Sequence, residues 1–168
     1  FWIDTNIPNW GSTGMYVDLG LYVEDQEVGD SANPWGNQYN YTTMAAAPQY
    51  HVNIRIAGDV AGYSSLTKST TGSAIEVVLD TTSNPKDIVV KGNRAVGIEG
   101  SIPLTALGVT TDSKIYPIVV LSGNTSTEHG AFNVIPEDSA NMLADAWNES
   151  GINMNPQGTY ANTYTVQA

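Results

Sequence analysis

Five aromatic residues lie in or beside polar segments that are rich in Asn and Gln. They are Trp10, Trp35, Tyr39, Tyr41 and Trp147. A flat aromatic ring can stack on the apolar face of a sugar, while neighbouring amide groups hydrogen-bond to the sugar hydroxyls. These residues are therefore our candidates for a ligand-binding surface that recognises carbohydrate. The alternative for each Trp is that it caps the hydrophobic core.

Acidic residues form a second set, which could bind a metal ion. Ca²⁺ prefers about six to eight oxygen ligands, which carboxylates and loop carbonyl groups supply. The candidate metal ligands are Asp4, Asp18, Asp25, Asp30 and Glu99. Their spacing does not follow an EF-hand loop, and the alternative is that they are exposed acids on the surface. We expect at least one bound Ca²⁺.

Catalytic patterns are weak in this chain. The two histidines, His51 and His129, are far apart in the sequence, and none of the patterns G-x-S-x-G, H-E-x-x-H, G-x-G-x-x-G or a P-loop occurs. His51 falls on the polar face of an alternating strand, so we expect it to be solvated. Paired carboxylates could form a glycosidase site, but the sequence does not place any pair at the required separation. The acids considered for such a pair are Asp18, Glu24, Asp25, Glu76, Glu99, Glu137 and Asp138. We expect no catalytic residue, and a stand-alone enzyme is the least favoured reading.

The charge balance limits the classes of partner. The 168 residues include 17 Asp and Glu against 6 Lys and Arg, which gives a net charge of −11. Nucleic acid is an unfavourable partner because neutralising phosphates requires clustered Lys and Arg. Charged residues make up only 14% of the chain, and Cys is absent. The surface must therefore be largely neutral and polar, which is typical of extracellular proteins. Membrane insertion is not expected, since no segment reaches the ~18 apolar residues of a spanning helix.

The elements that must position these residues are short β-segments separated by Gly, Pro, Asn and Ser. Residues 50–57 alternate between apolar and polar, the pattern of a half-buried strand, and residues 63–68 are the expected hairpin partner. Residues 115–121 are almost continuously apolar and predict a central buried strand. Pro117 marks a bulge or an edge within it, because proline has no N–H for a sheet. Further strands are expected at residues 1–4, 15–23, 74–80, 87–91, 94–102 and 160–166.

Helical signals are few. Residues 104–107 predict one helical turn before Gly108, and Asp138 to Trp147 is the one convincing helix. Gly92 and Asn93 are expected to link the strands on either side of them. The whole pattern predicts an all-β fold over residues 1–168, a single domain in the form of a two-sheet antiparallel β-sandwich of the jelly-roll or immunoglobulin-like type. Phe1 does not open a signal-peptide pattern, so the chain reads as a mature or excised part of a secreted protein.

Several segments resemble family 9 carbohydrate-binding modules and DOMON-like domains. They are Phe-Trp-Ile-Asp-Thr-Asn at 1–6, Ser-Thr-Gly at 12–14, and the stretches 46–54, 96–109 and 133–138. Such modules are appended to secreted amylopullulanases, glucodextranases and S-layer-associated proteins. The resemblance implies a Ca²⁺-stabilised sandwich that binds α- or β-glucans, and Asp4 and Glu99 match positions of the pattern.

The chain departs from that pattern at its start. In these modules the Ile-Asp-Thr segment usually follows two or more earlier strands, whereas here it opens the chain at Ile3. Either the N-terminal strands of the domain have been cut off, or another polypeptide supplies them. A sandwich without those strands has open sheet edges, which the remainder of a nicked chain or a strand from a neighbouring subunit can fill.

Two functions are therefore expected. The first is a non-catalytic glucan-binding module of a secreted, multidomain glycan-degrading protein. The alternative is an extracellular structural subunit, such as that of an S-layer, a filament or an adhesin, which assembles by β-strand donation and Ca²⁺. The expected partners are a polysaccharide, or other chains of the same or a nicked parent protein, at the cell surface.

Overall fold

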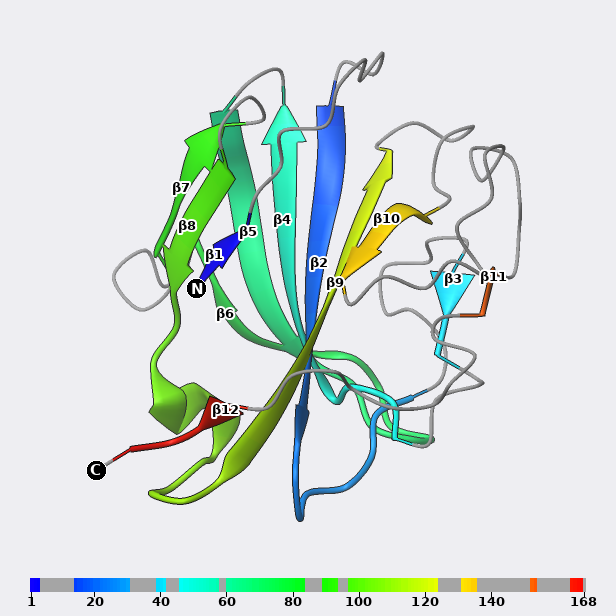
Figure 1. Cartoon of the computed structure of the whole chain (residues 1–168), viewed down its shortest axis with the longest axis vertical. Coiled ribbons are helices and arrows are strands. Elements are labelled where there is room, and N and C mark those ends of the chain that lie inside the picture. Colours follow the sequence, from blue (N-terminus) through cyan, green and yellow to red (C-terminus); the bar gives the residue numbers. More distant parts are fainter. Residues whose placement is uncertain are drawn as a thin grey trace.

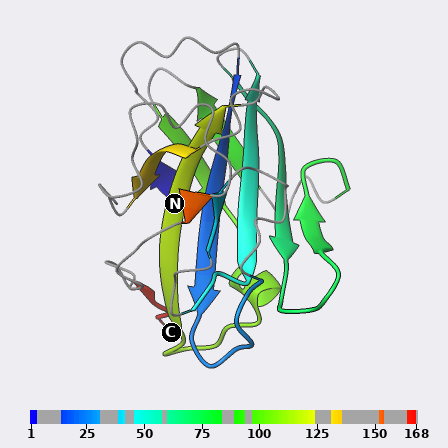
Figure 2. The same cartoon turned by 90° about the vertical axis from the view of Figure 1, so that its right-hand side faces the viewer.

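Strands dominate the structure. The computed structural model of the chain describes residues 1–3, 14–30, 39–41, 46–57, 60–83, 89–93, 97–123, 131–135, 152–153 and 164–167. Within these ranges, twelve strands are accompanied by a single short helix, the 3-10 turn η1 (Leu104–Leu107). The long strands β2, β4 and β9 run side by side along the length of the molecule (Figure 1 and Figure 2).

Ten of these strands belong to one antiparallel sheet. Its path begins with β1 (Trp2–Ile3), β8 (Gly97–Ser101), β7 (Val89–Asn93), β5 (Val60–Lys68) and β4 (Tyr50–Ala57). It continues with β2 (Gly14–Val23), β9 (Lys114–Gly123) and β10 (Ala131–Ile135). Off this path, β6 (Glu76–Asp80) pairs with β5, and β12 (Tyr164–Thr165) pairs with β9. A separate pair is formed by β3 (Tyr39–Asn40) and β11 (Ile152–Asn153). This pair is parallel, whereas the sequence predicts antiparallel pairing throughout.

The sheet folds over on itself to make two packed layers. Among the described residues, β5 and β7 pair only through Val60 and Asn93, and the fold-over occurs there. Strands β7, β8 and β1 form the smaller layer, and they lie over the face of β5, β4, β2 and β9 (Figure 1). This arrangement confirms the predicted antiparallel β-sandwich. The two layers share one hydrogen-bonded edge, while the opposite side lies between β1 and β9.

The hydrophobic core lies between the layers. Alternation along β2 and β4 turns Val17, Leu19, Val52 and Ile54 inward, where each is buried, and Ile98 of β8 packs on them from the smaller layer. Burial of one such aliphatic side chain contributes roughly 1.5–3 kcal/mol. The same core also takes in residues from both ends of the chain, Ile3 and Val166.

Several local predictions are confirmed. The hairpin of β4 and β5 forms, although β5 begins at Val60 rather than at residue 63. The helical turn at 104–107 ends at Gly108, whose φ of 62° is left-handed and therefore suits glycine. Pro117 lies in β9, on the edge that faces away from β2. On that edge it falls between the residues of β9 that pair with β10 and those that pair with β12.

Other local predictions are wrong or concern residues outside the described ranges. Gly92 and Asn93 belong to β7 and do not form the link, since the chain reverses after Asn93 and before Gly97. His51 is not solvated but fully buried, because Tyr41 and the segment that includes Gln49 cover the second face of β4. The predicted helix at 138–147 lies outside the described residues.

Candidate functional site

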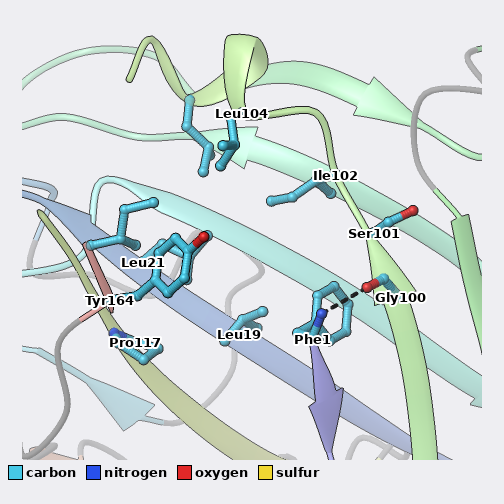
Figure 3. A pocket seen from close by; sticks show the side chains of 11 residues that line it. Phe1, Leu19, Leu21, Gly100, Ser101, Ile102, Leu104, Pro117 and Tyr164 are labelled. Carbon is cyan, nitrogen blue, oxygen red and sulfur yellow. Dashed lines mark hydrogen bonds between the residues drawn. The ribbon is translucent and has the colours of Figure 1, made fainter. Parts of the chain in front are cut away.

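A groove of about 510 Å³ opens on the side of the sandwich where β1 faces β9 (Figure 3). This volume falls within the ~300–1,000 Å³ of typical ligand pockets. Its lining residues come from both layers and from both ends of the chain. They are Phe1, Leu19, Leu21, Gly100, Ser101, Ile102, Leu104, Leu107, Ile115, Pro117 and Tyr164.

The groove has a buried apolar floor and an exposed apolar rim. Leu19 and Leu21 reach the floor because alternate residues of β2 face inward, and both are buried. Phe1, Leu104 and Tyr164 form the rim, and the side chain of Tyr164 remains 52% exposed. The lining that the structure describes includes no carboxylate or imidazole, so it offers apolar contact rather than acid–base chemistry or metal ligands.

Strand β1 forms one wall of the groove. The Phe1 backbone N donates to Gly100 O at 2.9 Å, and the Gly100 N–H donates back to Phe1 O at 3.0 Å. The Phe1 ring lies on Gly100, where any Cβ would clash with the ring carbons. A side chain at position 100 would therefore force the Phe1 ring to move. Alternation turns Ile3 into the core and leaves Trp2 60% exposed on the outside.

Next to β1, main-chain N–H and C=O groups just after β8 have no backbone partner among the described residues. Ile98 and Gly100 face β1, so the next residue on that edge is Ile102. Within the described part of the chain, neither the N–H nor the C=O of Ile102 has a backbone partner. Across the groove, β10 pairs with β9 down to Val119 and β12 pairs from Ile115, so no described strand pairs with Pro117 on this edge. The groove is thus bounded by two stretches of strand edge that no described residue pairs with.

An exposed charged pair lies on the β9 side of the sandwich. Tyr116 Oη donates to Glu24 Oε1 at 2.8 Å, and Lys114 Nζ lies 3.1 Å from Glu24 Oε2. The hydrogen bond from Tyr116, followed by that from Lys114, lowers the pKa of Glu24. The hydrogen bond to Glu24 raises the pKa of Lys114. Both side chains are well exposed, so the pair adds little to stability.

A second cluster, the buried polar cluster, lies on the face of β2 and β4 opposite the core. Tyr41 Oη donates to Asp18 Oδ2 at 3.1 Å, and His51 Nδ1 lies 3.2 Å from the same oxygen. His51 Nε2 lies 3.0 Å from Pro48 O. Both ring nitrogens of His51 are therefore engaged by protein oxygen atoms. In this geometry His51 is a structural residue of the cluster, with both nitrogens already in contact with protein groups.

The cluster also contains polar atoms that are not satisfied. Asn53 and Ser65 share this face with Asp18 through the strand register. Asn53 Nδ2 and Ser65 Oγ are buried and have no hydrogen-bond partner among the residues that the structure describes. The cluster therefore combines a hydrogen-bonded network around Asp18 with two polar groups that no described residue satisfies.

The predicted ligand-binding aromatics meet different outcomes. Tyr41 is 1% exposed and hydrogen-bonded to Asp18, so its prediction as a surface stacking ring is wrong. Tyr39 lies in β3, and its side chain is not described. Trp10, Trp35 and Trp147 lie outside the described residues.

The predicted metal ligands are not brought together. Asp18 is buried and engaged by Tyr41 and His51, which makes it a structural acid rather than an exposed loop ligand. Asp25 is exposed in a turn with a φ of 64°, Asp30 is half-buried, and Glu99 is exposed on β8. Asp4 lies outside the described residues. Among the residues described, no three His, Asp or Glu side chains cluster, so bound Ca²⁺ stays a prediction without a site.

Sequence reasoning missed the residues of the groove. Ile102, Pro117 and Tyr164 are far apart in the chain, and none carries a recognisable motif. Two sequence features are related to the groove, namely the apolar residues at 1–3 and Pro117 within an apolar strand.

Comparison of the chain with protein-family models, with curated proteins and with solved structures finds no match in any of the three. Across the described ranges, no helix is long and apolar enough to cross a membrane.

Proposed function

We propose that this chain is a non-catalytic β-sandwich module that accepts an extended strand of another polypeptide in its groove and so joins two chains in an extracellular assembly. One observation carries the proposal. An apolar groove lies between two strand edges, at Ile102 and at Pro117, with which no described residue forms a main-chain pair. This is the alternative among the expected functions, and the geometry favours it over glucan binding.

Strand addition explains the combination of features. In β-augmentation, main-chain hydrogen bonds to an open edge provide affinity, while pockets for alternate side chains provide specificity. Ile102 supplies the main-chain groups, and the groove beside it supplies the pocket. A sugar would need convergent polar side chains, whereas the described lining is almost entirely apolar.

A peptide-binding experiment tests the proposal. An eight-residue peptide that alternates Ile and Thr is titrated into the protein by calorimetry. We expect binding to the wild type and at least ~10-fold weaker binding to Leu104→Arg, which places a charge on the exposed rim. Ile75→Arg is the matched control, because Ile75 is an exposed aliphatic residue that does not line the groove. Equal affinity for all three proteins, or no binding to the wild type, overturns the proposal.

Glucan binding is the second candidate, and Trp2 favours it. Its indole is 60% exposed and rests beside Gly97, where a Cβ would lie 2.8 Å from Trp2 Cζ2. An exposed ring that is held in place suits stacking on a sugar, and the resemblance to family 9 modules leads to the same function. Affinity electrophoresis through starch, pullulan and β-glucan gels tests it. We expect retardation that Trp2→Ala abolishes and that Val77→Ala, at another exposed apolar site, preserves. Unretarded migration of the wild type in every gel excludes this candidate.

A further inference from the structure

We infer that Gln49 is a latch: its side-chain amide takes the place of a main-chain peptide group in the sheet, and it thereby holds residues 46–49 closed over the buried polar cluster. These four residues are named the strap, and Ala47, Pro48 and Gln49 within it are buried. The strap lies on the face of β2 and β4 opposite the core. The groove and the function proposed for it play no part in this device, which concerns the closed side of the sandwich.

The ladder between β2 and β4 has a place that the main chain cannot fill. Leu21 pairs with Tyr50, so the same register places Pro48 opposite Val23. Residues in a doubly hydrogen-bonded pair exchange both N–H···O bonds, and proline has no N–H to give. The main chain at position 48 therefore cannot complete the ladder at Val23.

The side chain of Gln49 fills that place. The Val23 N–H donates to Gln49 Oε1 at 3.0 Å, and Gln49 Nε2 donates to Val23 O at 2.9 Å. These are the two bonds that a paired residue of β4 would make, because a side-chain amide offers the same C=O and N–H as a peptide group. Gln49 O meanwhile accepts from the Ser69 N–H at 2.9 Å, next to β5. Gln49 thus joins β2 through its side chain and the β5 side through its main chain.

This exchange of roles lets the strap leave the sheet and cross the polar face. The Pro48 ring lies on Gly20, where a Cβ would be 2.9 Å from Pro48 Cγ. Pro48 O lies 3.0 Å from His51 Nε2. The Gly29 N–H donates to Ala47 O at 3.0 Å and ties the strap to the segment that follows β2. The strap therefore covers the buried polar cluster at His51.

The strap and the hydrophobic core are held by different contacts. Gln49 hydrogen-bonds only to the main chain of Val23, and Ala47, although buried, does not belong to the cluster of core side chains between the layers. Opening the strap would let water reach Asp18 and His51, and the hydration that these polar groups regain offsets part of the cost. Segments held chiefly by hydrogen bonds open at lower free energy than core strands do. We therefore expect the strap to open while the sandwich stays folded.

Amide exchange of the wild-type protein tests whether the strap opens separately. Val23 is hydrogen-bonded to the latch, whereas Val52 lies in the middle of the same ladder, paired with Leu19. After correction for intrinsic rates, we expect the Val23 amide to exchange at least ~10-fold faster than the Val52 amide. This comparison needs no variant, so it stands even if a latch variant fails to fold. Equal protection of the two amides overturns separate opening.

Chemical labelling of His51 tests the latch itself. Diethyl pyrocarbonate acylates accessible imidazole nitrogens, and mass spectrometry of the digested protein separates His51 from His129. Gln49→Met keeps the length of the side chain but removes both bonds to Val23. We expect His51 to be labelled at least ~10-fold faster in this variant than in the wild type, and the Val23 amide to exchange faster by a similar factor.

Gln26→Met is the matched control for labelling. The Gln26 side chain also hydrogen-bonds to main chain at this end of the sandwich, but it donates to Leu107 O and accepts from Tyr50 Oη, outside the strap. His51 should therefore be labelled at the wild-type rate in this variant. An unchanged rate in Gln49→Met, or the same acceleration in both variants, overturns the latch.

A double variant tests whether Gln49 stands in for main chain. Pro48→Ala combined with Gln49→Met restores an N–H at position 48, so the main chain there can pair with Val23 directly. We expect exchange of the Val23 amide to return to within ~3-fold of the wild-type rate. His51 should stay reactive, because the carbonyl group at position 48 then faces β2 rather than the imidazole. If the Val23 amide exchanges as fast as in Gln49→Met alone, the proposed replacement of main chain by the Gln49 amide is wrong.

Discussion

The two faces of β2 and β4 are both buried, but they are buried in opposite ways. The inner face carries aliphatic residues such as Leu19 and Val52, and part of it opens to solvent at the groove. The outer face carries Asp18, His51 and Asn53, and these are covered. The apolar face is therefore the one left partly open, and the polar face is the one that is closed. Alternation along a strand thus determines which residues share a face but not which face a neighbouring segment covers.

The largest effect is expected when the covered polar face loses the Asp18 carboxyl group. Asp18→Ala leaves the Tyr41 hydroxyl without this acceptor and the buried His51 Nδ1 without this partner. An unsatisfied buried polar group costs roughly 1–3 kcal/mol, so we expect about 4 kcal/mol for the two groups together. Chemical denaturation of the two proteins measures the change in the free energy of unfolding. Glu27→Ala, at an exposed acid, is the control and should change it by less than about 0.5 kcal/mol. Similar costs for the two variants would contradict this account of the polar face.

A somewhat smaller effect is expected on the apolar face of the same strand. Ile54 is fully buried between the layers, so Ile54→Ala removes apolar contact and leaves a cavity. Such substitutions cost about 2–5 kcal/mol, and we expect about 3 here. The same denaturation assay measures it, and a loss below about 1 kcal/mol would mean that the layers are not packed as described.

Two hydroxyl groups on the polar face should respond with opposite signs. Ser65 Oγ is buried without a partner, so Ser65→Ala should be neutral or stabilising by up to about 1 kcal/mol. Thr67 Oγ1 donates to His51 O at 3.4 Å, so Thr67→Val should cost about 1 kcal/mol. A destabilising Ser65→Ala would show that its hydroxyl has a partner, such as a bound water.

The smallest effect concerns the exposed pair outside both faces. The pKa of Glu24 is lowered in the folded protein, chiefly by the hydrogen bond from Tyr116. Its stabilising contribution is therefore present above the ordinary Glu pKa of 4.5 and is lost as the pH falls through the lowered value. Thermal unfolding between about pH 2 and pH 7 should show Glu24→Gln slightly less stable than the wild type at neutral pH, with the two curves converging in acid. A gap that widens in acid would reverse the assigned sign.

The fold could be predicted largely because its strands carry strong periodic patterns. The alternation at residues 50–57 and the apolar run at residues 115–121 correctly locate β4 and β9. The burial of His51 could not be predicted, because a polar residue on an alternating strand reads as solvated unless the covering segment is known. Tyr41 was misassigned for the same reason, since an aromatic residue in a polar segment can point inward as well as outward.

The candidate site was less accessible from sequence than the fold. The groove is created by chain closure, which brings Phe1 beside Gly100 and Tyr164 beside Ile115. These contacts span most of the chain, and no local pattern encodes them.

In the described part of the chain one residue pair joins β5 to β7, and this has a mechanical consequence. Val60 and Asn93 connect the two layers by strand pairing along one side, and the described core residues connect them by side-chain packing. An extra strand between β8 and β9 would hold the two layers together on the opposite side, because it would contact both layers at once. Pulling on that strand would then load the whole sandwich rather than one hairpin.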